Sequence, residues 1–173
     1  AIFTMDASFQ APEPGLEHQA DMPPLTPPPL AKVPKELKED VFLAWRHEHK
    51  ALRDEQPHPP RQHIWFRANG SLPDDVALQA CLLVYESDNA LLSTGRLPHR
   101  GAFVRERLQM ASLDHAMWFH QPAVGAWRAD EWLLYALDSP SSSSARCYNR
   151  GQIFTEQGLL IASTMQEGLM RRR

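Results

Sequence analysis

A segment dense in proline between residues 12 and 40 restricts what this chain can fold into. Prolines stand together at positions 23–24 and 27–29. Proline fixes φ and lacks a backbone N–H, so the segment cannot form a helix interior or a central strand. We therefore expect residues 12–40 to be a semi-rigid linker between residues 1–11 and one folded domain, residues 41–173.

The residues before the linker alternate like a half-buried strand. Phe3, Met5, Ala7 and Phe9 fall on one side of an extended chain, which is the period-two pattern of a strand. The linker supplies no partner strand, and an unpaired apolar strand promotes association. Our hypothesis is that residues 1–11 are the last strand of a preceding domain that is absent from this sequence.

The part after the linker has the pattern of several strands and one helix. Pro73 followed by Asp74 and Asp75 is typical of a helix start, and residues 76–83 are apolar on nearly every face. Such a helix must be enclosed by other structure. Strand-like runs occupy residues 41–45, 62–67, 111–120, 132–137, 146–155 and 159–170. We predict an α+β hotdog fold, a curved antiparallel sheet wrapped around a central helix.

Two short polar segments separate predicted strands. Residues 156–158, Glu-Gln-Gly, are typical of a turn, so the last two strands should form an antiparallel hairpin. Residues 141–144 are four serines, which we interpret as a polar loop.

Composition excludes several classes of protein. The chain has 173 residues and a net charge of −3, so no nucleic-acid partner is expected. No apolar run approaches the roughly 20 residues that span a bilayer, and no secretory signal is present. Cys81 and Cys147 stand alone, so we expect buried, reduced thiols in a cytoplasmic protein. The eight histidines lack metal-ligand spacing, and neither a metal nor a cofactor is expected.

Three polar residues stand inside otherwise apolar stretches. Asp88 follows the run from Cys81 to Tyr85, Ser112 opens the segment 112–120, and Gln166 follows residues 159–165. A buried or half-buried polar group is costly unless it is paired. The pattern predicts one site in which these three side chains hold and activate a water.

Several segments resemble the acyl-CoA thioesterase II family. They include Ala-Ser-Leu-Asp-His-Ala-Met-Trp-Phe-His at 111–120, Glu-Trp-Leu-Leu-Tyr at 131–135 and Ser-Thr-Met-Gln-Glu-Gly-Leu-Met-Arg at 163–171. Further matching segments are 7–12, 65–70, 85–88 and 146–151. Family members are double-hotdog proteins, in which two hotdog units on one chain pair with each other. The resemblance implies that this sequence is the tail of a first unit and the whole of a second.

The resemblance also implies a reaction and a site. It implies hydrolysis of acyl-CoA thioesters to free fatty acid and CoA, a reaction of lipid metabolism, with the acyl chain in a tunnel beside the central helix. Asp88 would be the general base, and Ser112 and Gln166 would position the water. Pairing of hotdog units implies a homo-oligomer.

Two alternatives remain beside the thioesterase. A unit without its partner could be a non-catalytic interaction module. A hotdog enoyl-CoA hydratase would use an Asp/His pair, for which Asp114 and His115 are candidates. Adjacent residues on a strand point to opposite faces, so we interpret both as structural.

Overall fold

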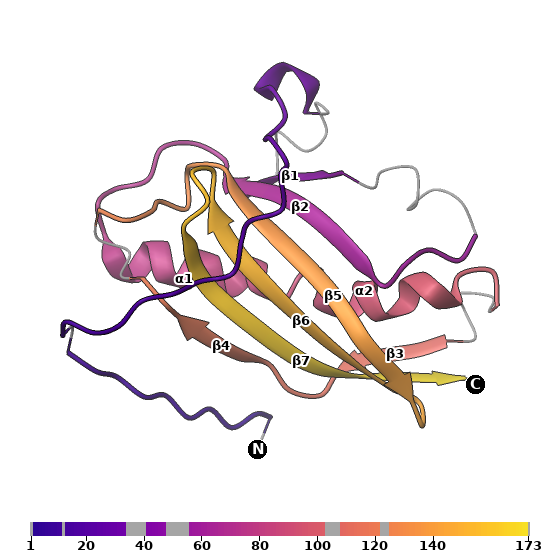
Figure 1. Ribbon diagram of the computed structural model, residues 1–173. Coiled ribbons are helices and arrows are strands. Elements are labelled where there is room, and N and C mark those ends of the chain that lie inside the picture. The colour runs from indigo at the N-terminus through magenta and orange to yellow at the C-terminus, as the bar shows by residue number, and fades with distance from the viewer. Residues whose placement is uncertain are drawn as a thin grey trace.

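The computed structural model describes residues 2–11, 13–33, 41–47, 56–102, 108–121 and 125–172. Within these ranges, seven strands form one antiparallel sheet (Figure 1). The strands are β1 (Phe42–Arg46), β2 (Arg61–Ala68), β3 (Leu108–Ser112), β4 (Ala116–Phe119), β5 (Leu133–Ser143), β6 (Arg146–Thr155) and β7 (Leu160–Arg172).

The strand order is β1-β2-β5-β6-β7-β3, and β4 also pairs with β7. The long strand β7 therefore has two partners along one edge. Residues 168–172 pair with β3, and residues 162–165 pair with β4. The single strand predicted over 111–120 is thus two strands, with residues 113–115 between them. This break matters for the site described below.

Both α-helices lie on one face of the sheet and the proline-rich linker crosses the other (Figure 1). The helices are α1 (Val76–Ser87) and α2 (Leu91–Arg96), and short 3-10 turns occur at η1 (Leu30–Lys32) and η4 (Leu97–His99). Successive side chains of β5 point to opposite faces of the sheet. Leu133 and Tyr135 pack in the core on the helix side, and Leu134 packs in the cluster on the other side. The predicted hotdog fold is confirmed.

The predicted helix start is also confirmed. Asp75 is the N-cap of α1, and its Oδ1 accepts hydrogen bonds from the backbone N–H groups of Ala77 and Leu78 at 2.9 and 3.1 Å. A capping carboxylate satisfies donors that the first helical turn leaves unpaired and complements the positive end of the helix. The helix therefore begins directly after Asp75.

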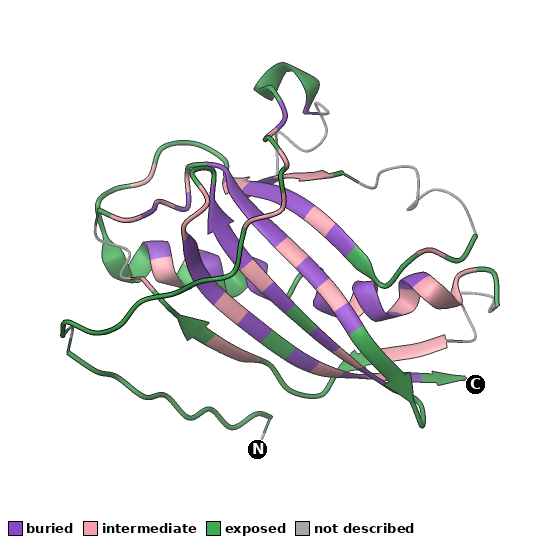
Figure 2. Ribbon diagram, viewed as in Figure 1, coloured by how far each residue is buried: buried purple, intermediate pink, exposed green. Residues whose placement is uncertain are grey.

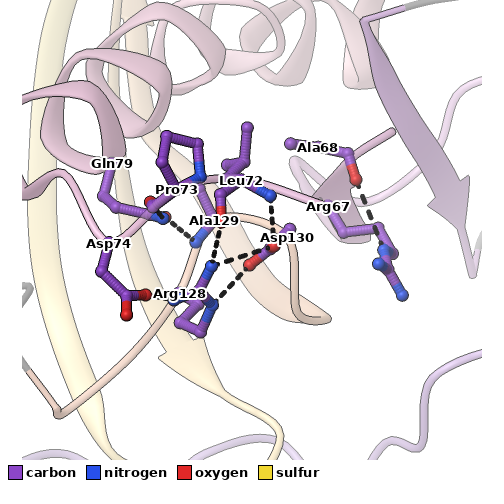
Figure 3. A network of polar contacts seen from close by, with 9 residues as sticks. All are labelled: Arg67, Ala68, Leu72, Pro73, Asp74, Gln79, Arg128, Ala129 and Asp130. Atoms are coloured by element: carbon purple, nitrogen blue, oxygen red, sulfur yellow. Dashed lines mark hydrogen bonds and ion pairs between the residues drawn. The ribbon is translucent and has the colours of Figure 1, made fainter. Parts of the chain in front are cut away.

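A second group of contacts fastens the start of α1 to the loop before β5 (Figure 3). Arg128 donates to Asp130 at 2.8 Å and to the carbonyl oxygen of Leu72 at 2.6 Å, and it also pairs with Asp74. Gln79 accepts a hydrogen bond from the backbone N–H of Ala129 at 2.7 Å. These contacts fix where α1 lies on the sheet.

The sheet covers only one side of α1, so the expectation of a fully enclosed helix is wrong. Leu83 is buried in the core, whereas Val76, Val84 and Tyr85 are exposed (Figure 2). Cys81 lies on the exposed side, which corrects the prediction of a buried thiol, and Cys147 is buried as predicted. The sequence pattern of α1 does not reveal which side is exposed. The helix is apolar on nearly every face, so the pattern does not show which of these faces packs on the sheet.

The linker is partly docked. Val33 is buried, and Met22 and Leu25 pack with it against the face of the sheet that the helices leave free. Gln19 donates to the carbonyl oxygen of Gly158 at 2.7 Å. The last linker residues, 34–40, lie outside the described part of the chain.

Residues 2–10 form no strand, and their apolar side chains are exposed (Figure 2). The period-two pattern at Phe3 to Phe9 is therefore not realised in this structure. The physical reason is that a strand needs a neighbour for its backbone hydrogen bonds, and no described strand pairs with this segment.

The serine segment is not a loop, because Ser141 to Ser143 belong to β5. The register between β5 and β6 shifts between Asp138 and Ser141, and this irregularity accommodates Pro140, which has no N–H to donate. Ser144 and Ala145 form the turn, both with positive φ. The predicted β6–β7 hairpin is confirmed, with Gly158 at φ +90° in its turn.

Candidate active site

The candidate site starts from one buried amide on β7. Alternation along β7 places Gln166 on the helix-facing side with Thr164 and Gly168. Gln166 is 1% exposed, so its polar atoms need partners. Its Nε2 donates a hydrogen bond to Oδ1 of Asp88. Its Oε1 is buried and accepts from no described residue.

Asp88 is the C-cap of α1, and its position depends on how that helix ends. The hydroxyl of Tyr135 donates to the carbonyl oxygen of Ser87 at 2.7 Å and lies 2.7 Å from Oγ1 of Thr164. Burial raises the pKa of Tyr135, so its hydroxyl stays a donor. The core thus holds the helix end, while the Asp88 side chain is 56% exposed and accessible to a ligand.

Ser112 lies on the same wall as Gln166. Ser112 on β3 is directly opposite Gly168 on β7, and opposite residues point to the same face of a sheet. Gln166 is two residues from Gly168, so Ser112 and Gln166 are diagonal neighbours, about 7–8 Å apart. Among the described residues the Ser112 hydroxyl has no hydrogen-bond partner, and it is exposed. The structure brings Asp88 and Gln166 into contact and leaves Ser112 beside them.

Asp88 and Ser112 line an open cleft of about 970 Å³, and Gln166 is buried behind Asp88. The size of the cleft is comparable with that of small-molecule sites, about 300–1,000 Å³. Both polar and apolar side chains line it. The polar ones are Thr4, Asp88, Asn89, Ser112, Asp114 and His115, and the apolar ones include Ile2, Phe3, Met5, Val84, Tyr85 and Leu113. The arrangement can hold a molecule with an apolar tail and a reactive polar group.

Asp114 fastens the segment between β3 and β4. Its Oδ1 accepts a hydrogen bond from the backbone N–H of Glu167 at 2.6 Å, and the N–H of Leu113 donates to the carbonyl oxygen of Glu167 at 2.9 Å. These contacts agree with the structural role that we assigned to Asp114.

His115 lines the cleft, although the sequence reasoning assigned it only a structural role. Its Nε2 lies 2.9 Å from Oγ of Ser87, and its Nδ1 lies 3.8 Å from Oδ1 of Asp88. We expected Asp114 and His115 on opposite faces, but residues 113–115 are outside both strands, and both side chains line the cleft. Strand alternation does not apply there.

Burial lowers the pKa of His115, and the nearby charges of Asp88 and Asp114 oppose this effect. A half-covered imidazole beside a carboxylate is neutral at neutral pH and can accept a proton. Within the described residues, no three His, Cys, Asp or Glu side chains are placed to hold a metal ion together, and no helix is long and apolar enough to cross a bilayer.

The fold and the cleft define a hotdog protein whose polar residues gather at the end of the central helix. The chain belongs to the acyl-CoA thioesterase family, whose model matches residues 39–169. Acyl-CoA thioesterase 2 of Haemophilus influenzae is 37% identical over 98% of this chain. Acyl-coenzyme A thioesterase 8 of Mus musculus is 34% identical over 99% of it.

Solved structures agree with this assignment. The acyl-CoA thioesterase II TesB2 from Mycobacterium marinum superposes with a TM-score of 0.75, at 40% identity over 95% of this chain and 60% of that one. A hot dog protein from Alicyclobacillus acidocaldarius, 17% identical with a TM-score of 0.67, covers 94% of this chain and 59% of that one, and supports the fold alone. The chain spans 64% and 59% of the two curated relatives.

Proposed function

We propose that the full-length protein carrying this chain hydrolyses acyl-CoA thioesters to a free fatty acid and CoA. The observation that carries the proposal is the hydrogen bond from Gln166 to Asp88, whose carboxylate lines a cleft together with Ser112, in a member of the acyl-CoA thioesterase family. Asp88 is the base that draws a proton from a water. Ser112 and Gln166 orient that water toward the thioester carbonyl carbon.

The walls of the cleft suit such a substrate. Phe3, Met5 and Tyr85 line it beside Asp88, so an acyl chain can lie against apolar side chains while its thioester faces the carboxylate. The exposed apolar side chains of residues 2–10 also support our domain proposal, in which residues 1–11 are the last strand of another hotdog unit and residues 12–40 are the linker. A homo-oligomeric state and a cytoplasmic location stay predictions.

Release of free thiol from acyl-CoA tests the proposal. Purified full-length protein should liberate one CoA thiol per acid from at least one member of a series of acyl-CoAs of increasing chain length. A hydratase would instead convert an enoyl-CoA to a hydroxyacyl-CoA without releasing thiol. An interaction module would do neither, and either of these outcomes contradicts the proposed hydrolysis.

A further inference from the structure

His115 lines the cleft but has no part in the mechanism proposed so far. It lies in the short segment between β3 and β4, both of which are hydrogen-bonded to β7. Both ring nitrogens face polar atoms of the end of α1, namely Oγ of Ser87 and Oδ1 of Asp88. The side chain is 23% exposed, so most of it is covered by neighbouring residues, although the residue as a whole counts as exposed because of its backbone.

The hydrogen bonds of Ser87 fix which ring nitrogen carries the proton. The Ser87 hydroxyl has one hydrogen, and it donates that hydrogen to the carbonyl oxygen of Val84 at 2.7 Å. Toward the ring, 2.9 Å away, it can then only accept. Nε2 of His115 must therefore donate to Ser87, and in the neutral ring Nδ1 has a free lone pair.

That lone pair faces the Asp88 carboxylate across 3.8 Å. The gap is too long for a direct hydrogen bond, for which about 2.7–3.2 Å is usual. A single water placed about 2.8 Å from each atom would span the gap and donate one hydrogen to each acceptor. Both hydrogens of such a water would be donated to Asp88 and His115, so its oxygen lone pairs would face away from the pair, as nucleophilic attack requires. Gln166 would then orient this water through its hydrogen bond to Asp88, and the Ser112 hydroxyl would donate to one of the lone pairs.

Basicity decides where a shared proton goes. The ordinary pKa of histidine is about 6.5 and that of aspartate about 3.9, so a proton on the pair rests on the imidazole. Burial lowers the pKa of His115 and keeps the resting ring neutral, whereas Asp88 and Asp114 are the charged groups that stabilise the imidazolium.

We propose that His115 is a further catalytic residue, which acts with Asp88 as one base and holds at Nδ1 the proton removed from the attacking water. This inference rests on the proposed hydrolysis. One O–H bond of the water breaks as its oxygen bonds to the thioester carbonyl carbon, and the π electrons of the carbonyl move onto the carbonyl oxygen. These electrons re-form the C=O bond when the tetrahedral intermediate collapses. The C–S bond then breaks, its electron pair leaves with the CoA sulfur, and His115 returns the proton to that thiolate.

The coupling can be measured without any turnover. NMR titration of the histidine rings in the full-length protein should give a lower pKa for His115 in Asp88→Asn than in the unmodified protein, by about 1, because the neighbouring negative charge is lost. His120 is the matched control, because it also pairs with a serine, Ser163, at 2.8 Å, and only burial shifts its pKa. An unchanged pKa of His115 overturns the proposal.

The pH profile of hydrolysis supplies the second test. In His115→Gln the amide keeps a donor for Ser87 but cannot take up a proton, so kcat should fall about 100-fold. The acidic limb of kcat/KM should move to lower pH, because protonation of His115 no longer removes the base. His120→Gln should keep both rate and profile.

The outcomes separate the two proposals. Full activity with an unchanged acidic limb in a folded His115→Gln protein overturns the role of His115 and leaves the proposed hydrolysis intact. If the unmodified protein releases no thiol from any acyl-CoA, the proposed function fails and the role of His115 fails with it.

Discussion

A buried amide and an exposed carboxylate form the centre of the candidate site. Gln166 and Asp88 are 78 positions apart in the chain and come from a strand and a helix end. Because Gln166 is buried, an unpaired amide there would be costly, and the hydrogen bond to Asp88 reduces that cost. The same bond orients the carboxylate in the cleft, which links packing to the proposed chemistry.

Ser112→Ala and Gln166→Ala should each lower kcat more than they raise KM. Both side chains are proposed to act on the water and not on the CoA portion, so their loss affects the transition state more than substrate binding. Steady-state kinetics of thiol release on folded variants measures both parameters. A change confined to KM would assign these residues to substrate binding instead.

The residue pattern could predict the grouping of Asp88 with Gln166 but not the place of His115. Polar residues in apolar stretches need partners, and that requirement is visible in a sequence. The break at residues 113–115 is not visible, because it depends on β3 and β4 pairing with different parts of β7. A continuous strand would have placed Asp114 and His115 on opposite faces.

At the scale of elements, both ends of α1 are fastened to the sheet domain. Arg128 and Asp130 hold its start, and Tyr135 on β5 holds its end through the carbonyl oxygen of Ser87. Tyr135 itself lies against Gly151 on β6, where a Cβ atom would come within 2.3 Å of the tyrosine ring. Gly151 leaves room for the Tyr135 ring, and Tyr135 holds the end of α1 that carries Asp88. The lack of a side chain at Gly151 therefore contributes to the position of Asp88.

Gly151→Ala should destabilise the fold by about 1–3 kcal/mol, because the added methyl group displaces the Tyr135 ring in a packed core. Urea unfolding followed by circular dichroism measures the change. Gly15→Ala is the control, since no atom lies within 4 Å of the added Cβ, and it should change the free energy of unfolding by less than about 0.5 kcal/mol. Equal unfolding midpoints for the two variants would contradict the packing argument.

Elements with strong local signals were predictable, and those that depend on tertiary contacts were not. Pro73, Asp74 and Asp75 mark the start of α1 in the sequence. The helix α2 has six residues and includes Gly95, whose added Cβ would clash with Cys147 and Asn149 on β6. Close packing on the sheet, and not local propensity, explains that glycine and that helix.

At the scale of the whole molecule, an apolar surface remains uncovered. Val76, Leu78, Val84 and Tyr85 on α1 are exposed, Tyr85 to 70%. Contiguous exposed apolar patches mark interaction surfaces. The other face of the sheet, in contrast, is partly covered. There the linker residues Met22, Leu25 and Val33 pack against the sheet.

A protein consisting of residues 1–173 should associate with itself at micromolar concentration, most simply as a two-fold dimer that covers this surface. Sedimentation velocity over a range of concentrations tests the expectation. Leu78→Glu should shift the equilibrium toward monomer, whereas Leu16→Glu, in the exposed part of the linker, should not. A monomer without concentration dependence would contradict it.

The most direct test of the central claim compares thiol release by the full-length protein with that by its Asp88→Asn variant. The amide keeps the size of the side chain and can still hydrogen-bond, but it cannot take up a proton, so we predict that kcat falls by about 100 to 10,000-fold while the fold is unchanged. Circular dichroism and the unfolding midpoint verify the fold. Near-normal hydrolysis of an acyl-CoA by a well-folded Asp88→Asn protein would remove Asp88 from the mechanism.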